Sequence, residues 1–144
     1  MRWEAKHWVA LKSLPEGVEQ EPHHDFPSFE TGHVRTKYQT IQAGAMVWPM
    51  PNTKLIAYDS CFTEADAWER LALEFSAGDC IIFRGDLVHA GASFDAMNYR
   101  IHCTLTVKGI KWRRDAAETA LFKQIKCAYC PFMVQMKLKV RNHT

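Results

Sequence analysis

The pattern of strands and turns is clearest in residues 76–93, which read SAGDCIIFRGDLVHAGAS. Gly78-Asp79 is a turn signal, and residues 80–83 form a short apolar run of a kind that favours β-strands. Gly85-Asp86 marks a second turn, after which His89 lies at the start of the next predicted strand. This stretch therefore predicts a fold of short strands in which a histidine begins one strand.

The rest of the chain continues this alternation of short strands and turns. Strands are predicted at residues 7–11, 22–26, 54–58 and 100–107, with one or two more around Gly44 within 37–48. Thr63-Glu-Ala-Asp66 resembles a capping box and predicts a short helix that ends near Leu71. Regular short strands of this kind indicate a mainly β protein, either a sandwich or a jelly roll.

Length and composition fit one domain. A chain of 144 residues with 47% hydrophobic residues and five tryptophans can bury a single core, so disorder is not expected. The net charge of +2 offers no general electrostatic case for nucleic acid or membrane binding. Five cysteines at scattered spacing are not a disulfide framework, and we see no signal peptide or membrane-spanning run. We therefore expect an intracellular protein, cytoplasmic or nuclear, without a membrane partner.

Three residues are candidate metal ligands. His23 and Asp25 are two positions apart, so on a strand their side chains point the same way, whereas His24 points to the opposite face. His89 would complete a set of two imidazoles and one carboxylate, the facial triad that leaves metal positions open for other ligands. Each residue alone also has a structural interpretation, as part of a solvated loop or as a buried histidine. Their order and their turn context together favour a metal site.

Arg100 is the candidate anion-binding residue. It lies near the start of the predicted strand 100–107, where its guanidinium can reach into a pocket. The planar guanidinium can bind a carboxylate through two parallel hydrogen bonds. The alternative is a surface residue in an ion pair.

Together these residues resemble the Fe(II)/2-oxoglutarate-dependent dioxygenases, including the phytanoyl-CoA hydroxylase-like and prolyl-hydroxylase-like branches. The family pattern is H-x-D, a long gap, a histidine and then a basic residue, which His23, Asp25, His89 and Arg100 match. The resemblance covers roughly residues 22–107. It implies a double-stranded β-helix (jelly-roll, cupin-like) with a few short helices.

The resemblance also implies an activity and its cofactors. Fe(II) would be held by His23, Asp25 and His89, and Arg100 would bind the far carboxylate of 2-oxoglutarate. The reaction would consume O₂, convert 2-oxoglutarate to succinate and CO₂, and hydroxylate an organic substrate that the sequence does not identify. His102 occupies a position where the family often has serine or threonine as a second carboxylate donor, and it is therefore a further candidate to bind the co-substrate.

Further residues are assigned to this site by their predicted place. Tyr38, Gln39 and Thr40, on a predicted neighbouring strand, are candidates to assist the co-substrate carboxylate. Trp48 and Phe94 are candidates for the substrate mouth, with core packing as the alternative for each.

The C-terminal part is predicted to be separate. Residues 1–110 would form the jelly-roll domain, 111–126 a helix and 127–144 a partial zinc finger. Cys127, Cys130 and His143 have the C-x₂-C-x₁₂-H spacing of the first three ligands of a C₂H₂-type or C₂HC-type finger. A structural zinc site needs four ligands, so accidental spacing is the alternative. A finger would indicate a nucleic acid or protein partner.

Two other classes remain open. The first is a cupin-like metal-binding protein or enzyme that does not use 2-oxoglutarate, in which Arg100 has no assigned role. The second is a non-catalytic jelly-roll interaction module, which predicts zinc without iron.

Overall fold

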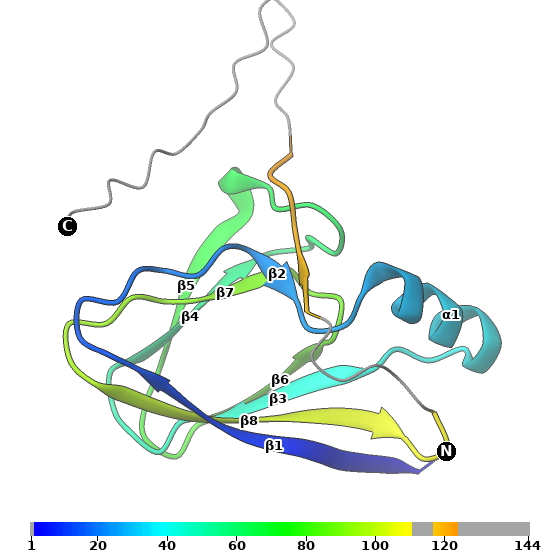
Figure 1. The fold of residues 1–144 in the computed structure, drawn as a ribbon, viewed down its shortest axis with the longest axis horizontal. Helices are drawn as coiled ribbons and strands as arrows, with labels where there is room; N and C mark the ends of the chain where they lie inside the picture. Colours follow the sequence, from blue (N-terminus) through cyan, green and yellow to red (C-terminus); the bar gives the residue numbers. More distant parts are fainter. Residues whose placement is uncertain (1, 111–116, 124–144) are drawn as a thin grey trace, which may run out of the picture.

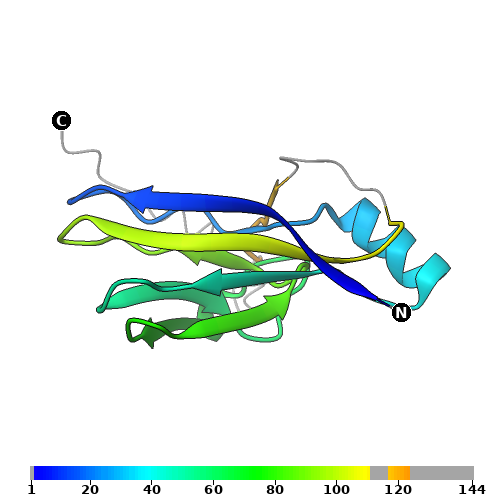
Figure 2. The same ribbon diagram turned by 90° about the horizontal axis from the view of Figure 1, so that it is seen from below.

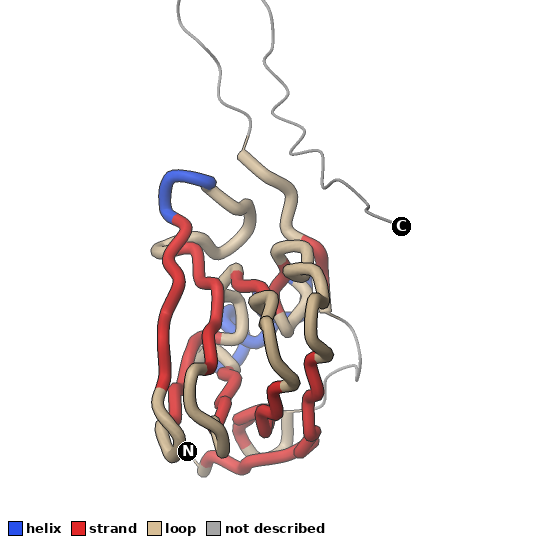
Figure 3. The backbone as a smooth tube through the Cα atoms, turned by 90° about the vertical axis from the view of Figure 1, so that its left-hand side faces the viewer, coloured by secondary structure: helices blue, strands red, loops and turns tan. Residues whose placement is uncertain are grey.

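The computed structural model describes residues 2–110 and 117–123, which form two antiparallel β-sheets that lie one over the other as a β-sandwich (Figures 1 and 2). The first sheet has the order β1 (Trp3–Ser13), β8 (Asn98–Val107), β3 (Ala43–Val47) and β6 (Cys80–Arg84). The second has the order β5 (Arg70–Phe75), β4 (Thr53–Tyr58), β7 (His89–Gly91), β2 (His23–His24) and β9 (Glu118–Thr119). Strands dominate the chain trace (Figure 3), so the prediction of a mainly β protein is confirmed.

The packing between the two sheets determines which side chains form the core and which face the candidate site. Met46, Trp48, Leu55 and Phe83 form one buried cluster, and the Trp48 ring stacks on Phe75 with centroids 3.7 Å apart. Side chains alternate along a strand, so Gly44, Met46 and Trp48 share one face. In the paired strands Met46 lies opposite His102, and Gly44 lies opposite Phe83.

Most strand predictions are confirmed. Residues 7–11 lie within β1, 54–58 within β4, 80–83 within β6 and 100–107 within β8. His89 begins β7, as the turn at Gly85-Asp86 predicted. The predicted strand 22–26 is reduced to the two residues of β2.

One or two strands were predicted around Gly44 within residues 37–48, and β3 confirms a strand there. Residues 37–38, at the start of that range, instead end a helix that the sequence did not predict, α1 (Ser28–Tyr38). In this helix only Thr31 and Val34 are buried, so it carries little of the apolar 3.6-residue pattern that identifies a helix.

The capping-box prediction also failed. The side chain of Asp66 does accept a hydrogen bond from the Trp68 N–H at 3.1 Å. The helix that follows is a single 3₁₀ turn, η1 (Ala67–Glu69), because the next residues form β5 and pair with β4.

The predicted helix 111–126 was wrong in the part that the structure describes. Glu118–Thr119 form β9, which pairs with β2 so that His23 lies opposite Thr119. The backbone N–H of Ala120 donates to the Pro22 carbonyl at 2.8 Å, which extends this pairing. Residues 111–116 and 124–126 lie outside the described residues, as do the predicted zinc ligands Cys127, Cys130 and His143. Within residues 2–110 and 117–123, no helix is long and apolar enough to cross a membrane.

Candidate metal centre

His23, Asp25 and His89 come together at the junction of β2 and β7. The two strands pair with His23 directly opposite His89, and the two imidazole centroids are 4.7 Å apart. Asp25 follows β2 directly. The potential ligand atoms of the three side chains all lie within 4.8 Å of one another, so the group could hold a metal ion.

Both imidazoles are oriented by backbone carbonyls. Nδ1 of His23 lies 2.8 Å from the Glu21 oxygen, and Nδ1 of His89 lies 2.9 Å from the Leu87 oxygen. A carbonyl oxygen only accepts hydrogen bonds, so each Nδ1 carries the proton. In the neutral form of each ring the lone pair is then on Nε2, and Nε2 of His89 lies 3.5 Å from Asp25 Oδ1. Hydrogen bonds of this kind fix the tautomer and orientation of metal-binding histidines.

The charges of the cluster suit a cation. Burial raises the pKa of Asp25, but the hydrogen bond with His102 and the nearby imidazole of His89 outweigh this effect and hold that pKa well below its ordinary value. Burial lowers the pKa of His23, and the neighbouring His89 adds to this effect. Burial also lowers the pKa of His89, but the Asp25 carboxylate raises it above the ordinary value overall. The site therefore offers an ionised carboxylate and a neutral His23.

The two oxygens of Asp25 have different neighbours. Oδ1 lies 3.5 Å from His89 Nε2, and Oδ2 lies 3.2 Å from His102 Nε2. The Phe83 ring packs against the His89 ring, with centroids 4.9 Å apart. Gly44 leaves the space for this ring, because a Cβ there would lie 2.7 Å from Phe83 Cζ and 3.0 Å from Asp25 Oδ2. A glycine within a strand is a known sign of such a close approach.

Arg100 is a buried cation beside the cluster. Its exposed fraction is 6%, and its Nη2 donates to Ser13 Oγ at 2.8 Å, while its Nε has no hydrogen-bond partner. The guanidinium carbon lies 5.3 Å from the centroid of the Phe94 ring. Burial lowers the pKa of Arg100. Among residues 2–110 and 117–123, no carboxylate forms an ion pair with it, so the position is suited to an external anion.

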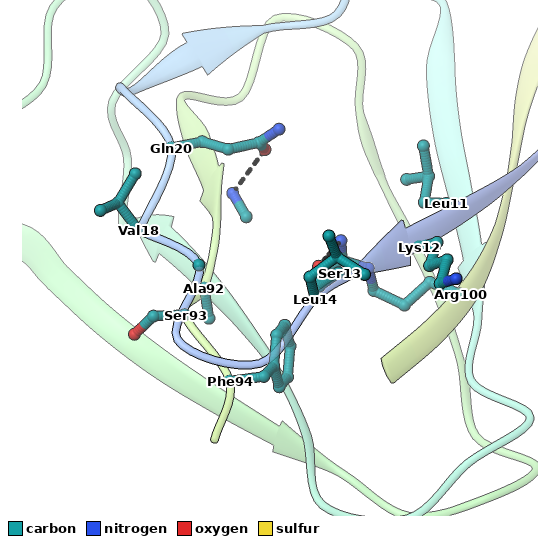
Figure 4. A pocket seen from close by; sticks show the side chains of 12 residues that line it. Leu11, Lys12, Ser13, Leu14, Val18, Gln20, Ala92, Ser93, Phe94 and Arg100 are labelled. Carbon is teal, nitrogen blue, oxygen red and sulfur yellow. Dashed lines mark hydrogen bonds between the residues drawn. The ribbon is translucent and has the colours of Figure 1, made fainter. Parts of the chain in front are cut away.

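Two adjacent cavities share Arg100. The first, of about 160 Å³, is bordered by the three candidate ligands, by His102 and by the apolar side chains Leu11, Met46 and Leu55. The second, of about 220 Å³, is lined by Ser13, Leu14, Val18, Ser93 and Phe94 (Figure 4). Leu11, Gln20, Gly91 and Arg100 border both. Gln20 lies across this boundary and accepts a hydrogen bond from the Gly91 N–H at 3.0 Å (Figure 4).

Other predicted site residues lie elsewhere. Tyr38 ends α1 and packs against Val34, Val107 and Ile110, and Gln39 and Thr40 follow the helix instead of lying on a strand. None of these three borders the two cavities, because the helix packs at the end of β8.

The remaining aromatic and histidine predictions fall within the described residues. Trp48 is completely buried in the core, whereas Phe94 lines the second cavity. His24 lies outside the cluster, with Nδ1 3.0 Å from the Phe26 carbonyl oxygen. Ser13 and Gly44 were not predicted, because their roles depend on strand pairing.

No protein-family model matches this chain, and no curated protein matches it by sequence. Solved structures do share its fold. The nickel complex of the non-haem monooxygenase ThoJ matches with a TM-score of 0.58 and 15% identity, over 84% of this chain and 52% of that chain. The apo form of ThoJ matches with a TM-score of 0.59 and 12% identity, over 85% and 54%. EvdMO1 matches with a TM-score of 0.57 and 13% identity, over 75% and 28%.

The chain thus shares its fold with the non-haem monooxygenase ThoJ and spans about half the length of that protein. At these identities the likeness concerns the fold alone.

Proposed function

We propose that this chain is the jelly-roll (double-stranded β-helix) domain of a non-haem Fe(II) oxygenase that uses 2-oxoglutarate and O₂ to hydroxylate an organic substrate. One observation carries the proposal: a cluster of two imidazoles and a carboxylate shares a cavity with a buried arginine that has no carboxylate partner among the described residues.

The donor set fits iron. His23, Asp25 and His89 offer two nitrogens and one oxygen, which is the composition of the facial triad of non-haem iron oxygenases. The Nδ1 hydrogen bonds orient both rings in advance, so little ordering remains when a metal binds. When bound, the iron would supply the redox chemistry with O₂. The protein would orient the reactants and exclude water.

Arg100 and Ser13 fit the co-substrate. Ser13 Oγ accepts a hydrogen bond from Arg100 Nη2, so its own proton remains free to be donated to a carboxylate. The unpartnered Nε of Arg100 is a further donor. A dicarboxylate with one end at the metal cluster and the other at Arg100 would pass the apolar side chains of Leu11, Met46 and Leu55. These features favour an oxygenase that uses 2-oxoglutarate over a cupin-like enzyme that does not use this co-substrate.

The test is an anaerobic titration of the apo protein with Fe(II), with and without 2-oxoglutarate. We expect a weak visible charge-transfer band that requires both components and is absent in His89→Ala. Iron binding without such a band would refute the role of 2-oxoglutarate and favour the cupin-like alternative. A lack of iron binding by the parent protein would refute the metal centre.

A further inference from the structure

His102 is a third histidine beside the cluster. It contacts the Asp25 carboxylate, but its ring nitrogens do not belong to the compact group of candidate ligand atoms. It lies on β8, opposite Met46 of β3, and borders the same cavity as the ligands. Its Nε2 lies 3.2 Å from Oδ2 of Asp25. The compact group of potential ligand atoms includes His23, Asp25 and His89 but not His102.

The hydrogen bonds define a different chemical role for this ring. His23 and His89 place a backbone carbonyl at Nδ1, which leaves the Nε2 lone pair for a metal. At His102 the acceptor is a carboxylate oxygen, and it lies at Nε2. A carboxylate oxygen accepts hydrogen bonds, so the proton in this 3.2 Å contact is on Nε2 of His102. The lone pair of Nε2 that a metal would need is therefore absent.

We propose that His102 is a positioning residue that donates from Nε2 to Oδ2 of Asp25 and thereby presents Oδ1 alone to the metal. This inference rests on the proposed metal centre and adds a determinant of how Asp25 would bind. Oδ1 is the oxygen that lies next to His89 Nε2. Oδ2, in turn, lies 3.2 Å from His102 Nε2. A hydrogen bond from β8 to this oxygen thus restricts rotation of the carboxylate.

Restricted rotation has a consequence for coordination. A carboxylate that binds through one oxygen occupies a single metal position, whereas a freely rotating one can bind through both. With His102 in place, the two histidines and Asp25 would use three positions and leave the others open. Loss of this hydrogen bond is therefore expected to change both the affinity and the coordination of the metal.

The experiment measures metal binding by the apo protein, without turnover. Ni(II) affinity is determined by isothermal titration calorimetry for the parent and for His102→Leu, His102→Asn and His102→Gln. Glutamine can place its N–H₂ group near the position of Nε2, whereas the shorter asparagine cannot. We expect affinity to fall about 10- to 100-fold in His102→Leu and His102→Asn, as for other lost partners of metal ligands, and to be restored to within a few-fold in His102→Gln.

A spectrum separates positioning from general structural damage. Co(II) bound to the parent and to His102→Gln should give the same visible absorption bands, and those of His102→Leu should shift as the carboxylate changes its binding mode. His33→Leu, which removes an exposed imidazole on α1, is the control and should change neither measurement.

The outcomes are distinct. Affinities and Co(II) bands in His102→Leu equal to those of the parent would overturn the inference but leave the metal centre intact. Equal losses of Ni(II) affinity in His102→Gln and His102→Asn would also overturn the inference, because it specifically predicts that a donor at the Nε2 position restores the affinity. If His102→Leu does not fold, the comparison of the glutamine and asparagine variants still decides. A parent protein that binds no Ni(II) would refute the metal centre itself and the inference with it.

Discussion

Replacement of Gly44 by alanine tests how closely β3 and β6 pack beside the metal centre. The new Cβ would lie 2.7 Å from Cζ and 2.8 Å from Cε2 of Phe83, and 3.0 Å from Oδ2 of Asp25. The shortest ordinary contact of this kind is about 3.4 Å, so the Phe83 ring must move by about 0.7 Å. This ring has little room, because it packs within the cluster of Met46, Trp48 and Leu55 and against His89.

Two opposing effects set the magnitude. Overpacking of a core costs about 1–3 kcal/mol, and removal of a strand glycine recovers about 0.5–1 kcal/mol of chain entropy. Because the Phe83 ring has little room to move, the overpacking cost should lie in the upper part of its range, about 2–3 kcal/mol, so the net loss in the free energy of unfolding is about 1–2.5 kcal/mol. For a chain of this size such a loss lowers Tm by about 2–10 °C. Movement of Phe83 and Asp25 should also weaken Ni(II) binding.

The assay is thermal unfolding followed by circular dichroism, together with calorimetric titration of Ni(II). The matched control is Gly32→Ala in α1, where no atom lies within 4 Å of the new Cβ. That variant should be more stable by about 0.5–1 kcal/mol, the usual gain for glycine to alanine in a helix. In the Gly44→Ala background, Phe83→Leu should cost less stability than it does in the parent, because the smaller side chain relieves the contact. A Gly44→Ala protein with the Tm and Ni(II) affinity of the parent would refute the close packing and its role at the site.

Three further predictions concern the site. Asp25→Ala should abolish Ni(II) binding while circular dichroism still reports a folded β protein, since the carboxylate is the only anionic ligand of the candidate set; retained binding would show that the metal is held elsewhere. Arg100→Ala should keep Fe(II) but weaken 2-oxoglutarate by about 2–4 kcal/mol in calorimetric titration, because a buried charged partner is lost, and unchanged binding would refute the carboxylate assignment. Ni(II) affinity should rise with pH through and above the ordinary pKa of histidine, about 6.5, because Asp25 raises the pKa of His89 and a proton on His89 Nε2 competes with the metal. An affinity that is constant between about pH 6 and pH 8 would exclude His89 as a ligand.

The residues that the sequence pattern predicted well are those with local signals. β6 and β8 are rich in β-branched and aromatic residues, and turns precede both β6 and His89. The spacing of His23 and Asp25 correctly predicted that both residues lie at the cluster, because the short strand β2 carries His23 and leads directly to Asp25. Helix α1 was not predicted because its buried face is too small to produce an apolar pattern with a period of 3.6 residues.

The other features of the site depend on contacts between segments that are far apart in the sequence, so no local pattern predicted them. Ser13 meets Arg100 only because β1 pairs with β8, an alignment that no local pattern encodes. The contact of His102 with Asp25 likewise joins β8 of one sheet to the residue that follows β2 of the other sheet. Gly44 carried a usable signal, since glycine within a strand often marks a close approach, but the partner ring could not be identified without the pairing of β3 and β6.

The shortness of β2 has a consequence for the order of assembly. Two residues supply too few backbone hydrogen bonds to define a register, and a slip by one position would bring His24 opposite His89 and turn His23 to the other face. The pairing of His24 with Glu118 fixes that register from the other edge, and Glu118 also accepts a hydrogen bond from the Ser28 N–H at the start of α1. Residues 118–119 therefore reinforce the placement of His23, so the metal-binding geometry gains this support only after most of the chain has been synthesised.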